Sequence, residues 1–268
     1  MVKTRIFGGL GNQMFQYAAG KALAEKHGSQ LMLDTSFFKS NKEREFMLDK
    51  FNIAREVTIS SKSGIFNSKI VRKIMSIVKV PRRYYRNYST AFDEKFFDLP
   101  ANVYIDGYFQ SEKYFGDIED VLRNEFVPSF KVSDDFKIWE EKIRNSNSVS
   151  IHVRRGDYLL KKNIAMHGIL GVDYYEKAVS EMENQIENPQ FYIFSDDEKW
   201  CREKIVPTTR NGCIINVNSK NRDVEELVLM SICKHNIIAN SSYSWWGAWL
   251  NENSEKKVVF PESSEILK

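Results

Sequence analysis

The sequence Ser148-Val-Ser-Ile-His-Val-Arg-Arg-Gly-Asp-Tyr158 predicts the fold and points to a ligand site. Its apolar residues from Val149 to Val153 predict a short buried strand, and the charged residues that follow predict a turn. Two adjacent arginines suit an anionic ligand, because guanidinium groups stay charged and bind phosphate oxygens in pairs. In open α/β sheets, ligands bind beyond the carboxyl ends of strands. The alternative is a surface turn with an internal pair between arginine and Asp157.

Strands and helices alternate around this turn and after it. The predicted order is strand 149–153, helix 174–186, strand 191–194, helix 197–203, strand 213–217, helix 224–234, strand 237–240, helix 244–251 and strand 258–260. This alternation with apolar strands is typical of a parallel, doubly wound sheet. We expect the polar residues at the strand ends to converge on one edge, namely Arg154, Arg155, Asp196, Asp197, Ser241 and Ser242.

The N-terminal half predicts a second βαβ unit. Strand 2–7 leads into a glycine turn at Gly8, Gly9 and Gly11, a helix that continues to about His27, and strand 30–34. The glycine spacing differs from the dinucleotide fingerprint. A strand at 103–110 and helices at 111–126 and 132–143 follow. The polar residues 145–148 predict a domain boundary, so we expect domains 1–146 and 147–268 with a cleft between them.

Composition narrows the class of protein. The chain has 268 residues, of which 42% are hydrophobic and 28% are charged, as in a folded soluble protein. The net charge of +3 is too small to indicate a nucleic-acid partner. Three cysteines without metal-site spacing indicate free thiols in a reducing compartment. Neither a signal peptide nor an apolar run long enough to span a bilayer is recognisable, so we expect a cytoplasmic protein.

One stretch is strongly basic. Residues 57–92 contain eight basic residues and no acidic one. Helical spacing within 62–86 separates an apolar face from a basic face, which is typical of peripheral contact with an anionic membrane surface. The alternative, which the pattern favours slightly, is a helix that packs its apolar face on the domain.

The sequence argues against several kinds of catalytic and binding site. The sequence contains no Gly-x-Ser-x-Gly nucleophile turn and no Gly-x-x-x-x-Gly-Lys-Ser/Thr phosphate loop. Asp196 and Asp197 are more typical of a helix cap than of a metal site. Trp245, Trp246 and Trp249 have a spacing that favours helix-to-sheet packing over stacking on a sugar.

The motifs together resemble a known family. His152-Val-Arg-Arg-Gly-Asp-Tyr158, Gly8-Gly-Leu-Gly-Asn-Gln-Met-Phe-Gln-Tyr17, Ser195-Asp-Asp-Glu-Lys-Trp200 and Ile237-Ile-Ala-Asn-Ser-Ser-Tyr-Ser-Trp-Trp-Gly-Ala-Trp-Leu250 resemble segments of the α-1,2-fucosyltransferases of glycosyltransferase family 11. Gly107-Tyr-Phe-Gln110 and Gly171-Val-Asp-Tyr-Tyr175 also match. The resemblance covers nearly the whole chain and points to a bacterial member. One departure is a C-terminus that is shorter than is usual in the family.

The resemblance implies a GT-B-like α/β fold with two Rossmann-like domains, the second binding GDP-β-L-fucose and the first binding the acceptor. The implied reaction transfers fucose to the 2-hydroxyl of a terminal galactose, with inversion and without a metal or other cofactor. The acceptor would be a surface glycan of the O-antigen type or its lipid-linked precursor. The alternatives are a fucosyltransferase of α-1,6 or O-linked specificity and a non-catalytic nucleotide or polyanion binder.

The resemblance also implies residue roles. Arg154 would bind the diphosphate, and Arg155 would support the motif or make a second contact. The remaining donor-binding residues would be His152, Gly9, Gly11, Asn12, Asp196, Ser241, Ser242 and Glu226, the last reading guanine where relatives often have Asp. Asp157 is the first candidate for the base that inversion requires. A structural role for Asp157, His167 as the base, and proton acceptance by the departing phosphate are the alternatives. His167 and Gln13 are candidates for acceptor contact.

Overall fold

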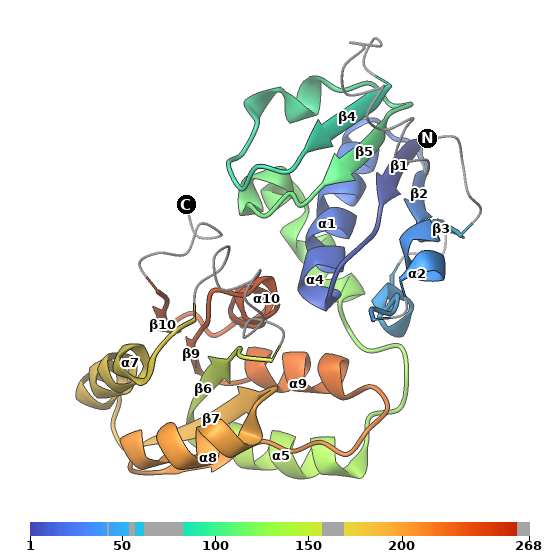
Figure 1. The fold of residues 1–268 in the computed structure, drawn as a ribbon. Helices are drawn as coiled ribbons and strands as arrows, with labels where there is room; N and C mark the ends of the chain where they lie inside the picture. Colours follow the sequence, from blue (N-terminus) through green and yellow to red (C-terminus); the bar gives the residue numbers. More distant parts are fainter. Residues whose placement is uncertain (42, 54–56, 62–82, 157–168, 262–268) are drawn as a thin grey trace. The chain divides into compact units, whose positions relative to one another are not determined.

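The computed structural model describes residues 1–41, 43–53, 57–61, 83–156 and 169–261 (Figure 1). The chain divides into two compact units, Met1–Ser129 and Phe130–Ile266. Each unit contains a sheet of five strands, all of them parallel. No helix in the described part of the chain is long and apolar enough to cross a bilayer.

The first unit is built around strand β1. Its strands are β1 (Val2–Arg5), β2 (Leu31–Asp34), β3 (Thr58–Ser60), β4 (Tyr84–Asn87) and β5 (Tyr104–Gly107). They lie in the order β3-β2-β1-β5-β4. The helices are α1 (Leu10–Lys26), α2 (Ser36–Ser40) and α4 (Glu119–Glu125), with 3₁₀ turns at Leu48–Lys50, Glu94–Asp98, Glu112–Tyr114 and Gly116–Ile118. The predicted strands at 2–7, 30–34 and 103–110 and the first helix are thus confirmed.

The predicted single helix 111–126 is wrong. Two 3₁₀ turns, Glu112–Tyr114 and Gly116–Ile118, precede the shorter helix α4. Phe115 between them has φ −151° and ψ 11°, which no α-helix accommodates. Tyr114 and Phe115 are buried at 0% and 1% exposure, so core packing overrides the local helical pattern.

The second unit has the strand order β10-β9-β6-β7-β8, which is the doubly wound order with the first strand in the middle. Its elements are α5 (Asp134–Arg144), β6 (Asn147–Val153), α7 (Val172–Gln185), β7 (Pro189–Ser195), α8 (Glu198–Lys204), a 3₁₀ turn (Val206–Thr208), β8 (Gly212–Ile214), α9 (Arg222–Ser231), β9 (His235–Ile237), α10 (Ser242–Trp249) and β10 (Val258–Val259). Every strand and helix predicted after residue 147 has a counterpart, but β9 ends at Ile237, where the predicted strand 237–240 begins.

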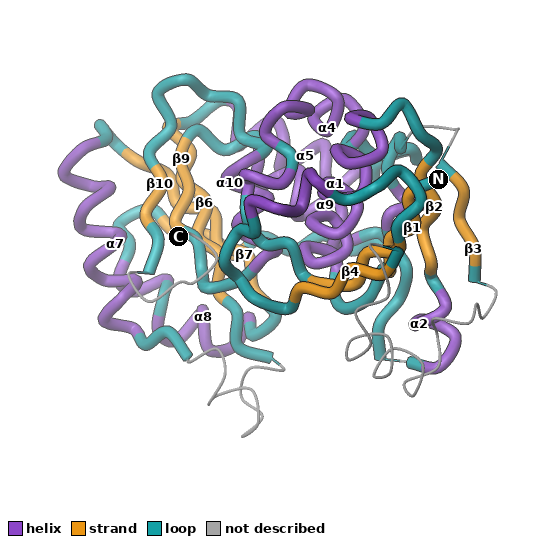
Figure 2. Tube along the Cα trace, turned by 90° about the horizontal axis from the view of Figure 1, so that it is seen from above, coloured by secondary structure: helices purple, strands orange, loops and turns teal. Residues whose placement is uncertain are grey.

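Helices cover both faces of the second sheet (Figure 2). Val149, Ile151 and Val153 of β6 belong to one apolar cluster with α7 and α8. The alternate residues Ser150 and His152 point to the other face, because successive strand residues alternate. There the Asn236 amide donates to Ser150 Oγ and to a carbonyl of α9. The strand therefore places His152 on the face that α9 and α10 cover.

The division between units falls at residues 129 and 130, not at the predicted 146 and 147. Helix α5 belongs to the second unit because its N-terminus is fastened to α9. Ser133 donates to the Glu225 carboxylate through its backbone N–H at 3.0 Å and through Oγ at 2.6 Å. Of the polar residues 145–148 that predicted the boundary, the first two connect α5 to β6 and the last two begin β6.

Candidate functional site

The candidate site lies at the carboxyl edge of the second sheet. Strands β7, β6 and β9 are adjacent and parallel, so the residues after Ser195, Val153 and Ile237 share one edge. From β6 the chain continues to β7 and β8 on one side of the sheet, and it then returns to form β9 and β10 on the other side. The boundary between β6 and β9 is therefore the switch point, where doubly wound sheets bind ligands. The strand-end residues that the sequence predicts to converge do so.

Arg154 is held beside Asp196. Its Nη1 lies 2.8 Å from Asp196 Oδ2, and the two side chains are 25% and 26% exposed. Asp196 Oδ1 also accepts the backbone N–H of Arg155 at 2.9 Å, which fixes the turn. A Cβ at Gly156 would lie 2.6 Å from Asp196 Oδ2, so a side chain at this position would displace the Asp196 carboxylate. The arrangement orients a partly exposed guanidinium at the sheet edge, where it can meet an anion.

Arg155 is anchored by an ion pair and by an aromatic ring. Its Nε lies 3.1 Å from Asp197 Oδ2, and its guanidinium lies 4.0 Å from the centroid of the Trp200 ring. Asp197 also caps α8 by accepting the backbone N–H of Trp200. The side chain of Arg155 is only 16% exposed. These contacts favour the supporting role for Arg155 over direct contact with a ligand.

His152 is buried with an unsatisfied ring nitrogen. It is 5% exposed, and no described residue hydrogen-bonds its Nδ1. Burial lowers the pKa of His152 to about 3, and the positive charge of Arg154 acts in the same direction. The imidazole is therefore neutral near pH 7. A buried polar atom without a partner costs about 1–3 kcal/mol, so His152 Nδ1 is a natural contact for a ligand.

Glu226 of α9 and Tyr243 of α10 complete the group of site residues. We call this group the strand-end cluster, and its other members are Arg154, Arg155, Asp196, Asp197 and His152. The His152 and Tyr243 rings are 5.4 Å apart, and the Tyr243 hydroxyl donates to the Asp223 carbonyl of α9 at 2.5 Å. Glu226 Oε1 accepts from Arg222 Nε at 2.6 Å. Burial raises the pKa of Glu226 to about 7, although Arg222 acts in the opposite direction. Glu226 is thus a carboxyl group whose charge changes near neutral pH.

Ser241 and Ser242 begin helix α10. Ser241 is buried, and its Oγ accepts the backbone N–H of Tyr243 at 3.3 Å, so it caps the helix. Ser242 is half-buried at the first helical position. The first N–H groups of a helix and its dipole favour an anion. This helix therefore adds a second anion-binding feature at the switch point that Arg154 occupies.

The three tryptophans of α10 pack internally. Trp245, Trp246 and Trp249 are 9%, 0% and 7% exposed. Trp245 and Trp249 stack at 6.2 Å, and Trp246 meets both rings edge-on. The predicted packing role is confirmed.

The glycine turn of the first unit follows β1. Gly8 has φ +80°, a conformation that favours glycine, and Gly9 precedes α1 in extended geometry. Gly11 is buried within the first turn of α1. Asn12 is half-buried, and its Oδ1 accepts from Gln110 Nε2 at 2.7 Å. The turn thus presents backbone and one amide at the carboxyl edge of this sheet.

Gln13 does not have the geometry of the predicted acceptor contact. It is 0% exposed. Its Nε2 donates to the carbonyls of Gly8 and Glu45, and its Oε1 accepts the backbone N–H of Met47. The side chain of Gln13 therefore fastens the 45–47 segment to α1, because every polar atom of its amide is used.

Three sequence predictions lie outside the described residues. These are Asp157 as base, His167 as base or acceptor contact, and the helical arrangement of the basic stretch over 62–82. The end of the predicted basic helix at 84–86 is wrong, because these residues belong to strand β4. Among described residues, no group of three or more His, Cys, Asp or Glu side chains is arranged to hold a metal ion.

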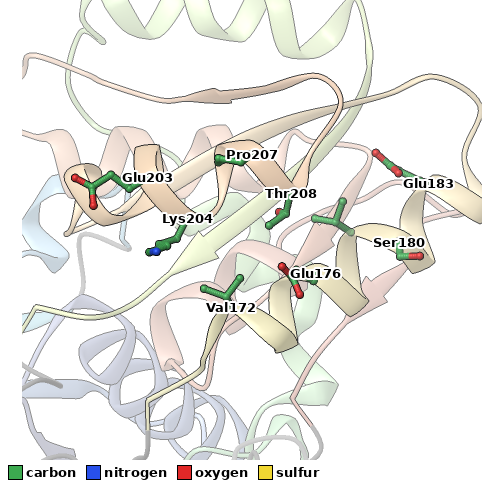
Figure 3. Close-up of a pocket in the computed structure, with 9 residues that line it drawn as sticks. Val172, Glu176, Ser180, Glu183, Glu203, Lys204, Pro207 and Thr208 are labelled. Carbon is green, nitrogen blue, oxygen red and sulfur yellow. The ribbon is translucent and has the colours of Figure 1, made fainter.

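A separate cavity lies between α7 and the α8 region (Figure 3). Its volume is about 600 Å³, and its lining includes Glu176, Glu183, Glu203 and Lys204. Three carboxylates and one ammonium group do not suit a diphosphate. None of the residues of the strand-end cluster lines this cavity.

Comparison with known proteins identifies one matching family and several relatives of this chain. The family model "Glycosyl transferase family 11" matches residues 1–266. An alpha-1,2-colitosyltransferase of Escherichia coli is 37% identical, over 93% of this chain and 87% of the relative. The O-antigen biosynthesis glycosyltransferase WbnK of Escherichia coli is 36% identical, over 95% and 91%. A galactoside 2-alpha-L-fucosyltransferase, Sec1 of Mus musculus, is 23% identical, over 93% of this chain and 64% of that protein.

The fold is also shared with a solved structure. The fucosyltransferase NodZ from Bradyrhizobium superposes with a TM-score of 0.56 at 12% identity, over 92% of each chain. The fold is GT-B-like, with two Rossmann-like units of parallel sheet. Together with the match over nearly the entire sequence, this shows that the chain belongs to glycosyltransferase family 11.

Proposed function

We propose that this glycosyltransferase moves L-fucose from GDP-β-L-fucose to the 2-hydroxyl of a terminal galactose in an O-antigen-type glycan. The observation that carries the proposal is the switch point of the second sheet. There Arg154 is oriented by Asp196, and helix α10 begins after the adjacent strand. A cation and a helix N-terminus together match the diphosphate of a nucleotide sugar.

The chemistry requires charge stabilisation on the leaving group. The galactose oxygen attacks the anomeric carbon, and the bond from that carbon to the diphosphate oxygen breaks with its electron pair. Negative charge develops on GDP, so Arg154 and the first N–H groups of α10 stabilise the transition state. Arg155, anchored on Asp197 and Trp200, positions the turn.

The proton of the attacking hydroxyl needs an acceptor. Asp157 follows the arginine turn directly in the sequence and is our first candidate for this base. His167 and the departing phosphate remain the alternatives. An active enzyme with Asp157→Asn and unchanged GDP affinity would remove Asp157 from this role.

The nucleoside fits the buried part of the cluster. An ionised Glu226 accepts from the N1–H and 2-amino groups of guanine, while His152 Nδ1 gains a partner from the nucleoside. The proposal also keeps Gly9, Gly11 and Asn12 as donor-binding residues, and it assigns the acceptor to the first unit. We also propose that residues 62–86 make peripheral contact with the cytoplasmic face of the membrane. We further propose that the reaction proceeds without a metal ion.

GDP-colitose is a second candidate donor, because an alpha-1,2-colitosyltransferase is 37% identical to this chain. Colitose is fucose without the 3-hydroxyl group. A site built to hydrogen-bond that hydroxyl rejects the deoxy sugar strongly, by about 10⁴-fold in the best cases, whereas an apolar site discriminates little. Competition between GDP-fucose and GDP-colitose therefore identifies the donor.

The experiment uses the full chain with labelled GDP-fucose, lactose or Gal-β-1,3-GalNAc, and EDTA. We expect a product whose linkage analysis gives fucose α-1,2 to galactose. An α-1,6 or peptide-linked product would assign another specificity. Absence of transfer from either donor to any galactoside would overturn the proposal, and tight, salt-sensitive RNA binding would then favour the polyanion binder.

A further inference from the structure

Four aromatic rings meet at the carboxyl edge of the first sheet. Phe7 follows β1, Phe37 follows β2, Tyr88 follows β4 and Tyr108 follows β5. These strands are neighbours in the order β2-β1-β5-β4 (Figure 1). The Phe7 ring centroid lies 6.1 Å from Phe37, 5.9 Å from Tyr88 and 5.3 Å from Tyr108. We call these four residues the aromatic edge.

The aromatic edge differs from the sealed core of the same unit. Phe7 is buried at 7% exposure, but the three rings around it are half-buried. Core rings such as Phe15 and Tyr17 are 0% exposed. The edge therefore keeps aromatic surface open at the end of the sheet where α/β proteins bind ligands.

A buried polar network fixes the rings in place. The Asp106 carboxylate, 0% exposed, accepts from Arg5 Nη1 at 3.0 Å, the Tyr88 hydroxyl at 2.7 Å and the Tyr84 hydroxyl at 2.8 Å. The Arg5 guanidinium carbon lies 4.8 Å from the Phe7 ring centroid. Because these partners are satisfied, the edge is organised before any ligand arrives, which lowers the cost of binding.

Polar groups suited to hydroxyls flank the rings. Within the described residues, the Tyr108 hydroxyl has no hydrogen-bond partner. Two residues further, Gln110 donates its Nε2 to Asn12 Oδ1, and its own Oε1 has no partner among the described residues. Planar amides and phenols offer both donors and acceptors to sugar hydroxyls.

We propose that the aromatic edge binds the terminal hexose of the acceptor. The C–H face of galactose, formed by C3, C4 and C5, packs against Tyr108 and Phe37, and the Tyr108 hydroxyl and Gln110 Oε1 hydrogen-bond its hydroxyls. This inference rests on the proposed function, because it assigns the acceptor side of that reaction.

The test compares Tyr108→Leu and Phe37→Leu with a matched control, Phe97→Leu. Leucine keeps apolar bulk but removes the flat ring. Phe97 is also half-buried, but its carbonyl accepts from Lys26 at the last position of α1, at the opposite edge of the sheet. One aromatic contact makes a modest contribution to binding, so we expect the KM for lactose to rise about 2- to 13-fold for each edge variant.

Three further readouts separate this role from a structural one. The KM for GDP-fucose and kcat should stay within error for the edge variants, each variant should remain folded at the assay temperature, and Tyr108→Phe should recover most of the lactose affinity. Saturation-transfer NMR with methyl β-D-galactopyranoside, without donor, tests sugar binding even if no transfer is found. An unchanged lactose KM and an unchanged NMR signal in both edge variants would overturn the inference, as would a rise in the GDP-fucose KM alone.

Discussion

The two sheets have related but different strand orders, and they differ in the chemistry of their carboxyl edges. In both, the first strand lies in the middle and every neighbour is parallel. The second edge carries arginines, carboxylates and a buried histidine, whereas the first carries the aromatic edge and an amide pair. The fold fixes where a ligand can bind, and the strand-end residues decide which ligand. One edge suits a nucleoside diphosphate and the other a sugar.

The largest effect should come from removing the charge at the second edge. Arg154→Ala should lower kcat by about 10²–10³-fold, because one stabilising group for the leaving diphosphate is lost. Steady-state kinetics with GDP-fucose and lactose measures this. The control is Arg144→Ala, a 58% exposed arginine of the same unit that pairs with Glu140. Equal losses in the two variants would show that Arg154 has no special role.

A smaller loss should follow from disturbing the turn without touching the arginine. The Cβ of Gly156→Ala would meet Asp196, so the carboxylate and the guanidinium it orients must shift. Displacements near 1 Å cost up to about 100-fold, and we expect a loss of about 10-fold in kcat. Gly171→Ala is the control, because no atom lies within 4 Å of its added Cβ. Wild-type kcat in Gly156→Ala would contradict the orienting role of Asp196.

Guanosine affinity should depend on pH through Glu226. Its pKa is raised to about 7, so the carboxyl is mostly neutral at pH 6 and ionised at pH 8. Only the ionised form accepts both guanine donors, so affinity should increase about tenfold over that interval, as two pH units around a pKa predict. Calorimetry with guanosine avoids the titration of phosphates, and His152, with a pKa of about 3, stays neutral throughout.

Glu226→Gln should abolish this pH dependence and weaken guanosine binding. Glu183→Gln, in the separate cavity, serves as its control. A pH dependence that survives in Glu226→Gln would assign the titration to another group.

The smallest effect on activity should come from loosening α5. Ser133→Ala removes a helix cap and one donor to the buried Glu225, so stability should fall by about 1–3 kcal/mol while kcat is unchanged. Urea denaturation measures the change. Ser129→Ala, at the end of the first unit, loses only a 3.4 Å contact to the Asp49 carbonyl and should be neutral. Equal stability of both variants would contradict the stabilising role of Ser133 as helix cap and as donor to Glu225.

The second sheet could be predicted from the sequence because its three central strands, β6, β7 and β9, are buried on both faces. Runs such as Val149–Val153 and 191–194 stand out between helical patterns. The first sheet was predictable only in part. Strand β3 has exposed residues, and β4 has an exposed arginine at Arg86, so neither has the apolar signature of a central strand.

The residues of the candidate site also differ in how far the sequence could predict them. Arg154 and Asp196 were predictable, because adjacent strands must bring their ends together. The burial of Gln13 was not, because its partners Glu45 and Met47 lie in an irregular segment. The aromatic edge was also missed, since Phe7 and Tyr108 are distant in the chain and meet only through the strand order.

The central claim is that Arg154 binds the diphosphate of a guanine nucleotide. The most direct test is the ratio of GDP to guanosine affinities, measured by calorimetry in the wild type and in Arg154→Ala. We predict that the wild type strongly prefers GDP, and that the variant loses most of this preference while its guanosine affinity is unchanged. The same GDP preference in both proteins would contradict the claim.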